Sequence, residues 1–436
     1  SLHACMKNYR YYCSKLSLSI GILMILLTPL IISSAVIFPY ISPKIITIQI
    51  GIIFCVLAVV ICNRSELRFT WTHIAALSYL AILTTSAIGG TDPMRSLLGT
   101  HERQQGVITS VYWFVFALCL AHLIRNEREW RALFQCVCAG GYIISLLALL
   151  HYSGLITIDN LYQDNDRLSY TIGNASILAA YLACVVPISS GLLASAIQKK
   201  RYYTEAALHS AGLLIITTAL VATGTRSAII AVSLWACVAV LTLPRDIKAP
   251  IFGLIFVAAL TAAAFNWNLL ETRLAELTIE SPAVSGRFDA WSIAYRAIKA
   301  APIIGIGAEN FIVAFGALSS PGEAGIETFD NPHSHLLDIT ISSGITGLAC
   351  YAALLFACAI ALWKHRKPIE QDKVVEHRSI IIGVLLIYQM TASVLFEAHV
   401  SQALFYLAVA YCLSISPNLK SPLSSNWVTR PIGIGI

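Results

Sequence analysis

The stretch NPHSHLLDIT, which begins at Asn331, sets two histidines and an aspartate at the start of an apolar run. Asn331 is a favourable helix N-cap and Pro332 a favourable first helical residue, so we expect a helix to begin here. Two positions on a helix differ by roughly 200°, so His333 and His335 are expected to point to opposite sides. Asp338 follows His335 by three residues and is expected to share its face.

The chemistry that suits these side chains is proton transfer. A carboxylate at Asp338 can hold one ring nitrogen of His335 and leave the other nitrogen as a proton acceptor. The exposed amides and positive dipole end of the helix start disfavour an imidazolium ion and attract anions. His335 is therefore a candidate general base, and on spacing alone a capping or interfacial histidine fits it nearly as well. For His333 we prefer the simpler interpretation of a capping or interfacial histidine.

Three arginines are candidates for binding an anion. Arg226, in VATGTRSAII, falls at a short turn between two apolar runs, where ionisable residues tend to face the bundle interior and serve function. Arg287, in SGRFDAW, lies at an expected helix start, where a guanidinium fork suits a phosphate. Arg103, in GTHERQQG, gives a weaker signal and also fits an interfacial residue. Because the sequence has no nucleotide-binding motif in the proper context, a lipid phosphate is the more natural ligand.

The composition places these residues in a membrane protein. The chain is 57% hydrophobic and only 12% charged, with a mean hydropathy of +0.74, whereas soluble domains carry roughly 25% charged residues. A membrane span needs about 20 mostly apolar residues. We predict twelve such spans, over residues 17–38, 44–62, 71–88, 106–124, 131–152, 174–197, 206–222, 227–243, 250–267, 335–362, 379–396 and 401–416.

The predicted fold class is an all-α integral membrane protein with one large external loop. The first nine spans occupy residues 1–267, the loop residues 268–334 and the last three spans residues 335–416, followed by a cytoplasmic tail over 417–436. With the N-terminus in the cytoplasm, most of the 29 Lys and Arg residues fall on the cytoplasmic side, in agreement with the positive-inside rule. The net charge of +6 therefore reflects topology and does not indicate a nucleic-acid partner.

The large loop contains a helical pattern. Large apolar residues recur there at intervals of three and four, at Phe288, Trp291, Tyr295 and Ile298. This spacing predicts an amphipathic helix that starts at Ser285 or Gly286, ends before Pro302 and lies on the membrane surface or against the bundle. A second short helix is expected near residues 308–317.

In their order and placement these features resemble the O-antigen ligase family. The superfamily also holds O-antigen polymerases and protein O-oligosaccharyltransferases. The resemblance rests on the spans, the external loop before the tenth span, the arginines in GTRSA and SGRFDAW, and the histidine pair in HSH. It implies a helical membrane glycosyltransferase fold of the GT-C type. One departure is Leu336, where many relatives have an asparagine directly after the catalytic histidine.

The resemblance implies an inverting glycosyltransferase of lipopolysaccharide synthesis in the bacterial inner membrane, with its active site facing the periplasm. The donor would be a glycan on undecaprenyl diphosphate, and the acceptor the outer-core sugar of lipid A-core. His335 matches the essential histidine and would deprotonate the acceptor hydroxyl, while Arg226 and Arg287 match the arginines assigned to the diphosphate. Neither a metal nor another cofactor is implied. The supporting candidates are Asp338, Arg103 and His333.

Other functions stay open. An O-antigen polymerase or a protein O-oligosaccharyltransferase would share the donor and differ in the acceptor. A metal-dependent transferase would use Asp164 and Asp166 of the DND motif together with the histidines, although such a motif recurs easily by chance. A secondary transporter fits the number of spans, but the long loop and the lack of a clear charge at the centre of a span oppose it.

Overall fold

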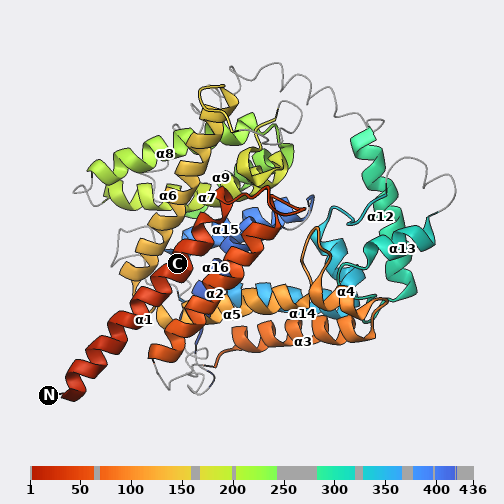
Figure 1. The fold of residues 1–436 in the computed structure, drawn as a ribbon, viewed down its shortest axis with the longest axis horizontal. Helices are drawn as coiled ribbons and strands as arrows, with labels where there is room; N and C mark the ends of the chain where they lie inside the picture. The colour runs from red at the N-terminus through yellow and green to blue at the C-terminus, as the bar shows by residue number, and fades with distance from the viewer. Residues whose placement is uncertain are drawn as a thin grey trace, which may run out of the picture.

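The long apolar runs of the sequence fold as helices, because helices satisfy their own backbone hydrogen bonds. A computed structural model describes residues 2–62, 69–158, 167–198, 203–242, 282–319, 328–365, 377–395, 398–417 and 419. No β-strand occurs within these ranges (Figure 1). The helices are α1 (Leu2–Leu27), α2 (Ser42–Cys62), α3 (Trp71–Gly89), α4 (Pro93–Leu98), α5 (Val107–Leu123), α6 (Glu127–Tyr152), α7 (Ala175–Gln198), α8 (Tyr203–Ala222), α9 (Arg226–Thr242), α12 (Pro282–Ala300), α13 (Phe311–Leu318), α14 (His335–Lys364), α15 (His377–Ala392) and α16 (His399–Ile415), with short 3₁₀ turns η1 (Thr28–Leu30) and η2 (Tyr170–Ile172).

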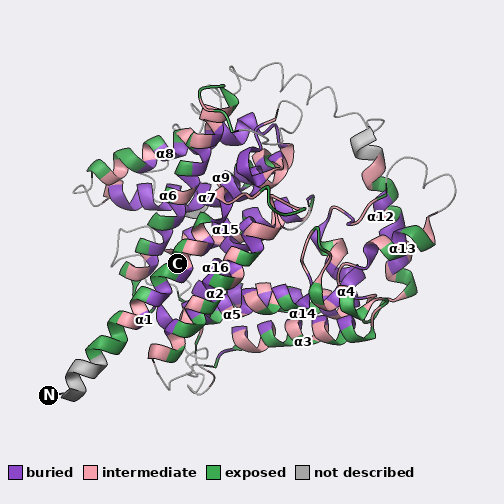
Figure 2. Ribbon diagram, viewed as in Figure 1, coloured by how far each residue is buried: buried purple, intermediate pink, exposed green. Residues whose placement is uncertain are grey.

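The centre of the bundle is formed by α7 and α16. Both helices are apolar on nearly every side, and such a helix is stable only when other helices surround it. In the apolar stretch of α7 that is long enough to span a membrane, 94% of the residues are buried. The helix packs against α6, α8, α9, α15 and α16. Figure 2 shows this burial in the upper half of the bundle. Gly191 permits the close approach of α15, because a Cβ there would lie 2.4 Å from Ile380.

Among the described residues, seven helices are long and apolar enough to cross a membrane: α1, α2, α3, α6, α7, α8 and α14. The helices α5, α9 and α16 are apolar but shorter. The predicted span over 250–267 lies outside the described residues. The all-helical membrane fold is therefore confirmed, while the number of twelve spans stays a prediction.

The first helix differs from its predicted bounds. The sequence predicts a span over 17–38, but α1 runs from Leu2 to Leu27 and is followed by η1. Pro29 lies in that turn, and a proline disfavours helical geometry in the residue before it. The chain then crosses to α2, which packs closely on α1 through Gly21 and Gly51, where a Cβ would meet the opposite backbone.

The predicted span over 335–362 is interrupted. At Gly344 the backbone of α14 takes φ +66° and ψ −171°, which breaks the helix. The segment 302–307 lies against this break: Ile306 and Gly307 donate to the carbonyls of residues 341 and 342, each at 2.9 Å, and the Ile345 amide donates to Pro302 at 2.9 Å. Backbone groups that an unbroken helix would use internally are thus used to hold the loop.

The helices α4, α12 and α13 gather at one end of α3 and α14 (Figure 1). We call these three helices, with the segments 99–106, 302–310 and 328–334, the outer layer. The two predicted loop helices are present in it as α12 and α13. They share a small apolar core with the start of α14, formed by Ile293, Ala294, Ala297, Phe311, Phe315 and Ile341.

The buried face of α12 is not the one predicted from its aromatic residues. Phe288 and Tyr295 are 51% and 59% exposed. The side chains buried against α13 and α14 are instead Ile293 and two alanines. Alanines let neighbouring helices approach closely, so the small residues rather than the large ones form the contact. The exposed aromatic rings are available for the membrane surface.

Candidate functional site

The two histidines lie on either side of the start of α14. The helix begins at His335, after Ser334 as N-cap. The side-chain oxygen of Asn331 accepts a hydrogen bond from the His333 amide at 2.8 Å, which closes a tight turn before the helix. His333 has φ +51°, in the left-handed region that residues other than glycine rarely adopt. The predicted helix start at Asn331 and Pro332 is therefore wrong, because the local turn leaves His333 outside the helix.

His335 points into the bundle. Its side chain is buried, with 5% of the residue exposed. The ring lies edge-on to Tyr351, with 5.3 Å between centroids, and close to Tyr388 of α15 at 6.4 Å. The histidine predicted as the base thus lies among aromatic rings. The predicted contact between His335 and Asp338 stays a prediction.

His333 lies instead among charged groups of the outer layer. Its ring packs edge-on against Phe329, with 5.6 Å between centroids. Burial lowers the pKa of His333 to about 4, together with the charges of Arg103 and Arg287, and Asp330 opposes this shift. The imidazole is therefore neutral near pH 7.

Two arginines that are far apart in the sequence lie within electrostatic range of each other. Burial lowers the pKa of Arg287 on α12, and the charge of Arg226 at the start of α9 adds to this effect. Like charges held within electrostatic range raise the free energy of both, and a bound anion would relieve the repulsion. The structure thus brings together the two arginines predicted to bind the diphosphate.

The turn that carries Arg226 is held by an arginine that the sequence did not single out. Arg167 donates to the carbonyl of Thr223 at 2.9 Å and to the Thr225 hydroxyl at 3.0 Å. Between them Gly224 has φ +61°, a conformation that favours glycine. Arg167 therefore fixes the short turn before α9. Only its place in an external loop could have drawn attention to it.

Arg103 forms a two-bond ion pair with Asp330. Its Nε donates to Asp330 Oδ2 at 2.5 Å and its Nη2 to Oδ1 at 2.8 Å. Burial alone would lower the pKa of Arg103, but the bond to Asp330 and the nearby charges of Asp338 and Glu102 raise it. Burial alone would raise the pKa of Asp330, and Arg103 holds it below its usual value. Both groups therefore stay charged, and Arg103 is more than the interfacial residue that the sequence suggested.

The segment that carries Arg103 is fixed by Glu309, which the sequence analysis also missed. The Glu309 carboxylate accepts a hydrogen bond from the Thr100 amide at 2.5 Å and a second one from the Gln105 amide. The next residue, Asn310, donates to the Ser96 hydroxyl at 2.9 Å. Both lie in GIGAENF, whose paired glycines were the available signal for a tight backbone approach.

The helix that carries Arg287 is tied to the histidine segment. Trp291 on α12 donates its indole N–H to the carbonyl of Pro332 at 3.0 Å. Gly286 allows Phe329 to approach, since a Cβ would lie 3.1 Å from its ring. The outer layer thus fixes Arg287 and His333 relative to each other. Asp164 and Asp166, on which a metal-dependent alternative rests, lie outside the described residues.

Comparison with known proteins found one family match, over the middle part of the chain. Residues 211–352 match the family model described as O-Antigen ligase, which confirms the predicted resemblance for this part of the chain. The matched range contains Arg226, Arg287 and both histidines, whereas Arg103 lies before it. No curated protein matches the chain.

Proposed function

Starting from the O-antigen ligase domain over residues 211–352, we propose that the chain transfers a glycan from undecaprenyl diphosphate to the outer-core sugar of lipid A-core. The transfer would take place at the periplasmic face of the bacterial inner membrane and invert the anomeric centre. The observation that supports the proposal is that the charge of Arg226 acts on Arg287 and that the charge of Arg287 acts in turn on His333.

The arginines suit the leaving group. When the glycosidic bond to the diphosphate breaks, negative charge grows on the phosphate oxygens, and fixed cations lower the energy of that state. Guanidinium groups bind phosphate oxygens through two parallel hydrogen bonds. Arg226 and Arg287 lie close enough to influence each other electrostatically, as two groups on one diphosphate must.

The geometry favours His333 as the base over His335. His333 is within electrostatic range of Arg287 and Arg103, while His335 lies against Tyr351 and Tyr388. The arginine charges lower the pKa of His333, so a diphosphate that neutralises them would raise it and strengthen the base. Proton transfer would then be favoured only once the donor is bound.

The bonds balance in a single displacement. The acceptor hydroxyl oxygen attacks the anomeric carbon from the side opposite the diphosphate and forms the new glycosidic bond. Its proton passes to the neutral imidazole, and the bond from the anomeric carbon to the diphosphate oxygen breaks, so undecaprenyl diphosphate leaves. In this proposal Asp330 holds Arg103 and its negative charge favours the imidazolium formed on His333, while Asp338 adds negative charge that acts on Arg103.

Reconstitution tests the proposal. The purified full chain, with a lipid-linked glycan and lipid A-core, is expected to form covalently extended lipid A-core, and activity is expected to survive a chelator. We compare His333→Gln with His335→Phe, which keeps an aromatic ring against Tyr351. His333→Gln should lower transfer by about 100-fold or more, the range for loss of a general base, and His335→Phe should retain most of it.

Each other outcome has a definite meaning. Loss of transfer in His335→Phe with retention in His333→Gln would return the base to His335. Extension of a second lipid-linked glycan instead of lipid A-core would identify a polymerase, and extension of a protein a protein O-oligosaccharyltransferase. Movement of the lipid-linked glycan across the membrane without a covalent product would identify a transporter and overturn the proposal.

A further inference from the structure

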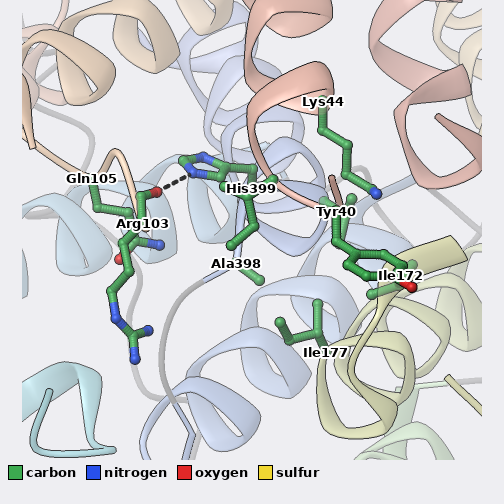
Figure 3. A pocket seen from close by; sticks show the side chains of 10 residues that line it. Tyr40, Lys44, Arg103, Gln105, Ile172, Ile177, Ala398 and His399 are labelled. Carbon is green, nitrogen blue, oxygen red and sulfur yellow. Dashed lines mark hydrogen bonds between the residues drawn. The ribbon is translucent and has the colours of Figure 1, made fainter. Parts of the chain in front are cut away.

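Polar contacts with two helices of the bundle hold the outer layer in place. Figure 3 shows one of them, in which Nε2 of His399 on α16 lies 2.9 Å from the backbone carbonyl of Arg103. Because a carbonyl only accepts, the ring nitrogen donates. The other is the break at Gly344, where the segment 302–307 docks on α14. The bundle therefore fixes the height of the outer layer relative to the membrane.

The segment at the break has an apolar sequence. Residues 300–308 read AAPIIGIGA and contain no polar side chain. Ile303 and Ile304 are 62% and 47% exposed, although isoleucine is among the residues most often buried. Ile345 of α14 is exposed as well, and the two segments are joined here, since the Thr346 hydroxyl donates to the Ile303 carbonyl at 2.6 Å. We call Ile303, Ile304 and Ile345 the isoleucine patch.

The isoleucine patch continues an exposed stripe of α14. Ile345, Phe356 and Trp363 are 57%, 68% and 62% exposed. They follow one another at intervals of eleven and seven residues, which return to about the same side of a helix. Because α14 is long and apolar enough to cross a membrane, an exposed stripe of large apolar side chains on it is suited to contact lipid. Ile303 and Ile304 extend this apolar surface at the outer end of the stripe.

The length of α14 places the isoleucine patch at the edge of the hydrocarbon. After the break, residues 345–364 extend about 30 Å at the usual helical rise, which matches the thickness of a hydrocarbon core. Trp363 and Lys364 lie at the far end of this stretch, and tryptophan and lysine are both common at a membrane interface. The isoleucine patch lies at the opposite end, and so at the opposite boundary.

The helix α3 ends at the same level. It starts at Trp71, which is 64% exposed, and ends beside the break, where the Ser86 hydroxyl donates to the Ser342 carbonyl. The segment 302–307 follows α12, whose Lys299 places its ammonium 4.6 Å from the centroid of the Tyr295 ring. A lysine beside an aromatic ring is suited to the level of the lipid headgroups. A cation followed by apolar residues is the order expected where a chain meets a membrane boundary.

We propose that the isoleucine patch inserts into the acyl chains of the adjacent leaflet and anchors the outer layer to the bilayer. The partner is lipid hydrocarbon, because the patch continues the apolar stripe of a membrane helix and carries no charge. A second copy of the chain is the other surface that such a patch could meet. The inference does not depend on the proposed transfer reaction, so it is tested without a substrate.

A crosslinking test places benzoylphenylalanine at Ile303 or at Ile304 of the full chain, in vesicles of phosphatidylethanolamine and phosphatidylglycerol. On irradiation this side chain bonds to neighbouring C–H groups. At both positions the labelled peptide is expected to gain the mass of one phospholipid, as it should at Phe356 on the exposed stripe of α14. His101, an exposed polar residue of the segment 99–106, is the control, and no phospholipid should be added there.

Two results of the crosslinking test would overturn the proposal. Crosslinks from Ile303 and Ile304 to a second copy of the chain would identify a protein interface. Phospholipid added at Phe356 but at neither isoleucine would show that the isoleucine patch does not enter the bilayer.

A second measurement needs no variant. Hydroxyl radicals generated in water oxidise the side chains that water reaches, so the native chain is oxidised in lipid nanodiscs and each residue is compared with the same residue in the unfolded chain. Ile303 and Ile304 should be protected as strongly as Phe356. Tyr203, which is 77% exposed at the start of α8, should be oxidised readily. Oxidation of the two isoleucines to the same relative extent as Tyr203 would refute insertion.

Discussion

The bundle around α7 and α16 and the outer layer are stabilised in different ways. In the bundle, apolar side chains are buried on nearly all sides of the central helices. In the outer layer, long-range polar contacts hold the pieces: Arg103 to Asp330, Glu309 to two amides, Trp291 to Pro332. The difference teaches that the bundle is specified by many weak and interchangeable contacts, whereas the site depends on a few directed ones.

The largest effect on transfer is expected where the two regions join. Gly344→Ala would place a Cβ 2.1 Å from the Ile303 carbonyl at a residue with φ +66°. The segment 302–307 would be displaced, and transfer should fall on the order of 100-fold, as for a misplaced reacting group. Gly316→Ala on α13 is the control, because nothing lies within 4 Å of its added Cβ. Native turnover in Gly344→Ala would show that the outer layer does not need this junction.

The second largest loss of transfer is expected on removal of Glu309, which we expect to act by positioning Arg103. Glu309→Ala would leave two amides without their acceptor and release the segment that carries Arg103. We expect transfer to fall about tenfold or more, the cost of losing charge-assisted hydrogen bonds.

A double-mutant cycle separates positioning from general destabilisation. In the Arg103→Ala background, Glu309→Ala should cost little further activity. Full additivity of the two losses, measured as kcat/KM for the donor, would contradict a role through Arg103.

The pH dependence tests the electrostatics of the site. Because the pKa of His333 is lowered to about 4 in the free protein, kcat/KM for the donor should stay level from neutral pH down to about pH 5. With the donor bound, the arginine charges are neutralised, so kcat should decline at a higher pH than kcat/KM.

The same shift affects stability. The folded pKa of His333 lies below the ordinary 6.5, so the unfolded chain binds more protons between these values, and stability falls as the pH drops from about 6.5 to 4. His333→Gln should reduce this loss of stability when the unfolding midpoint is measured as a function of pH.

The kinetic prediction has its own contradicting outcome. If kcat and kcat/KM for the donor declined at the same pH, donor binding would not be coupled to the pKa of His333.

The smallest effect on transfer is expected from a change within the bundle. Gly212→Ala would place a Cβ 2.1 Å from the Tyr142 ring, between α8 and α6. Such overpacking costs about 1–3 kcal/mol of stability, and should lower the unfolding midpoint. Transfer per folded molecule should stay near the native value. A specific loss of turnover would show that bundle packing and site geometry are coupled.

The sequence predicted what depends on hydropathy and local signals. The helical membrane fold, both loop helices and the family resemblance were correct, because apolar periodicity and turn residues act over short ranges. Arg226 and Arg287 were singled out because charges near apolar runs are rare, and their role in binding a diphosphate stays a prediction. The predicted helices were wrong where a proline or glycine interrupted an apolar run. The first helix ends before Pro29, and α14 is broken at Gly344.

The parts that escaped prediction depend on contacts between distant residues. Asn331 has the composition of an N-cap but closes a turn around His333. Glu309 and Arg167 are ordinary loop residues until the fold brings them to Thr100 and Thr223. No local pattern encodes such pairs, so the role of each side chain became visible only with the tertiary structure.

The break in α14 also constrains how the chain acquires its shape. The Ile341 carbonyl accepts a hydrogen bond from the Ile306 amide, and the Ser342 carbonyl accepts one from the Gly307 amide and another from the Ser86 hydroxyl of α3. Until the neighbouring segments arrive, a helix that enters the bilayer would expose these groups to hydrocarbon, where each costs several kcal/mol. Assembly of the outer layer therefore follows an order: α3 and α14 must be inserted side by side before the segment 302–307 can dock between them and complete the fold.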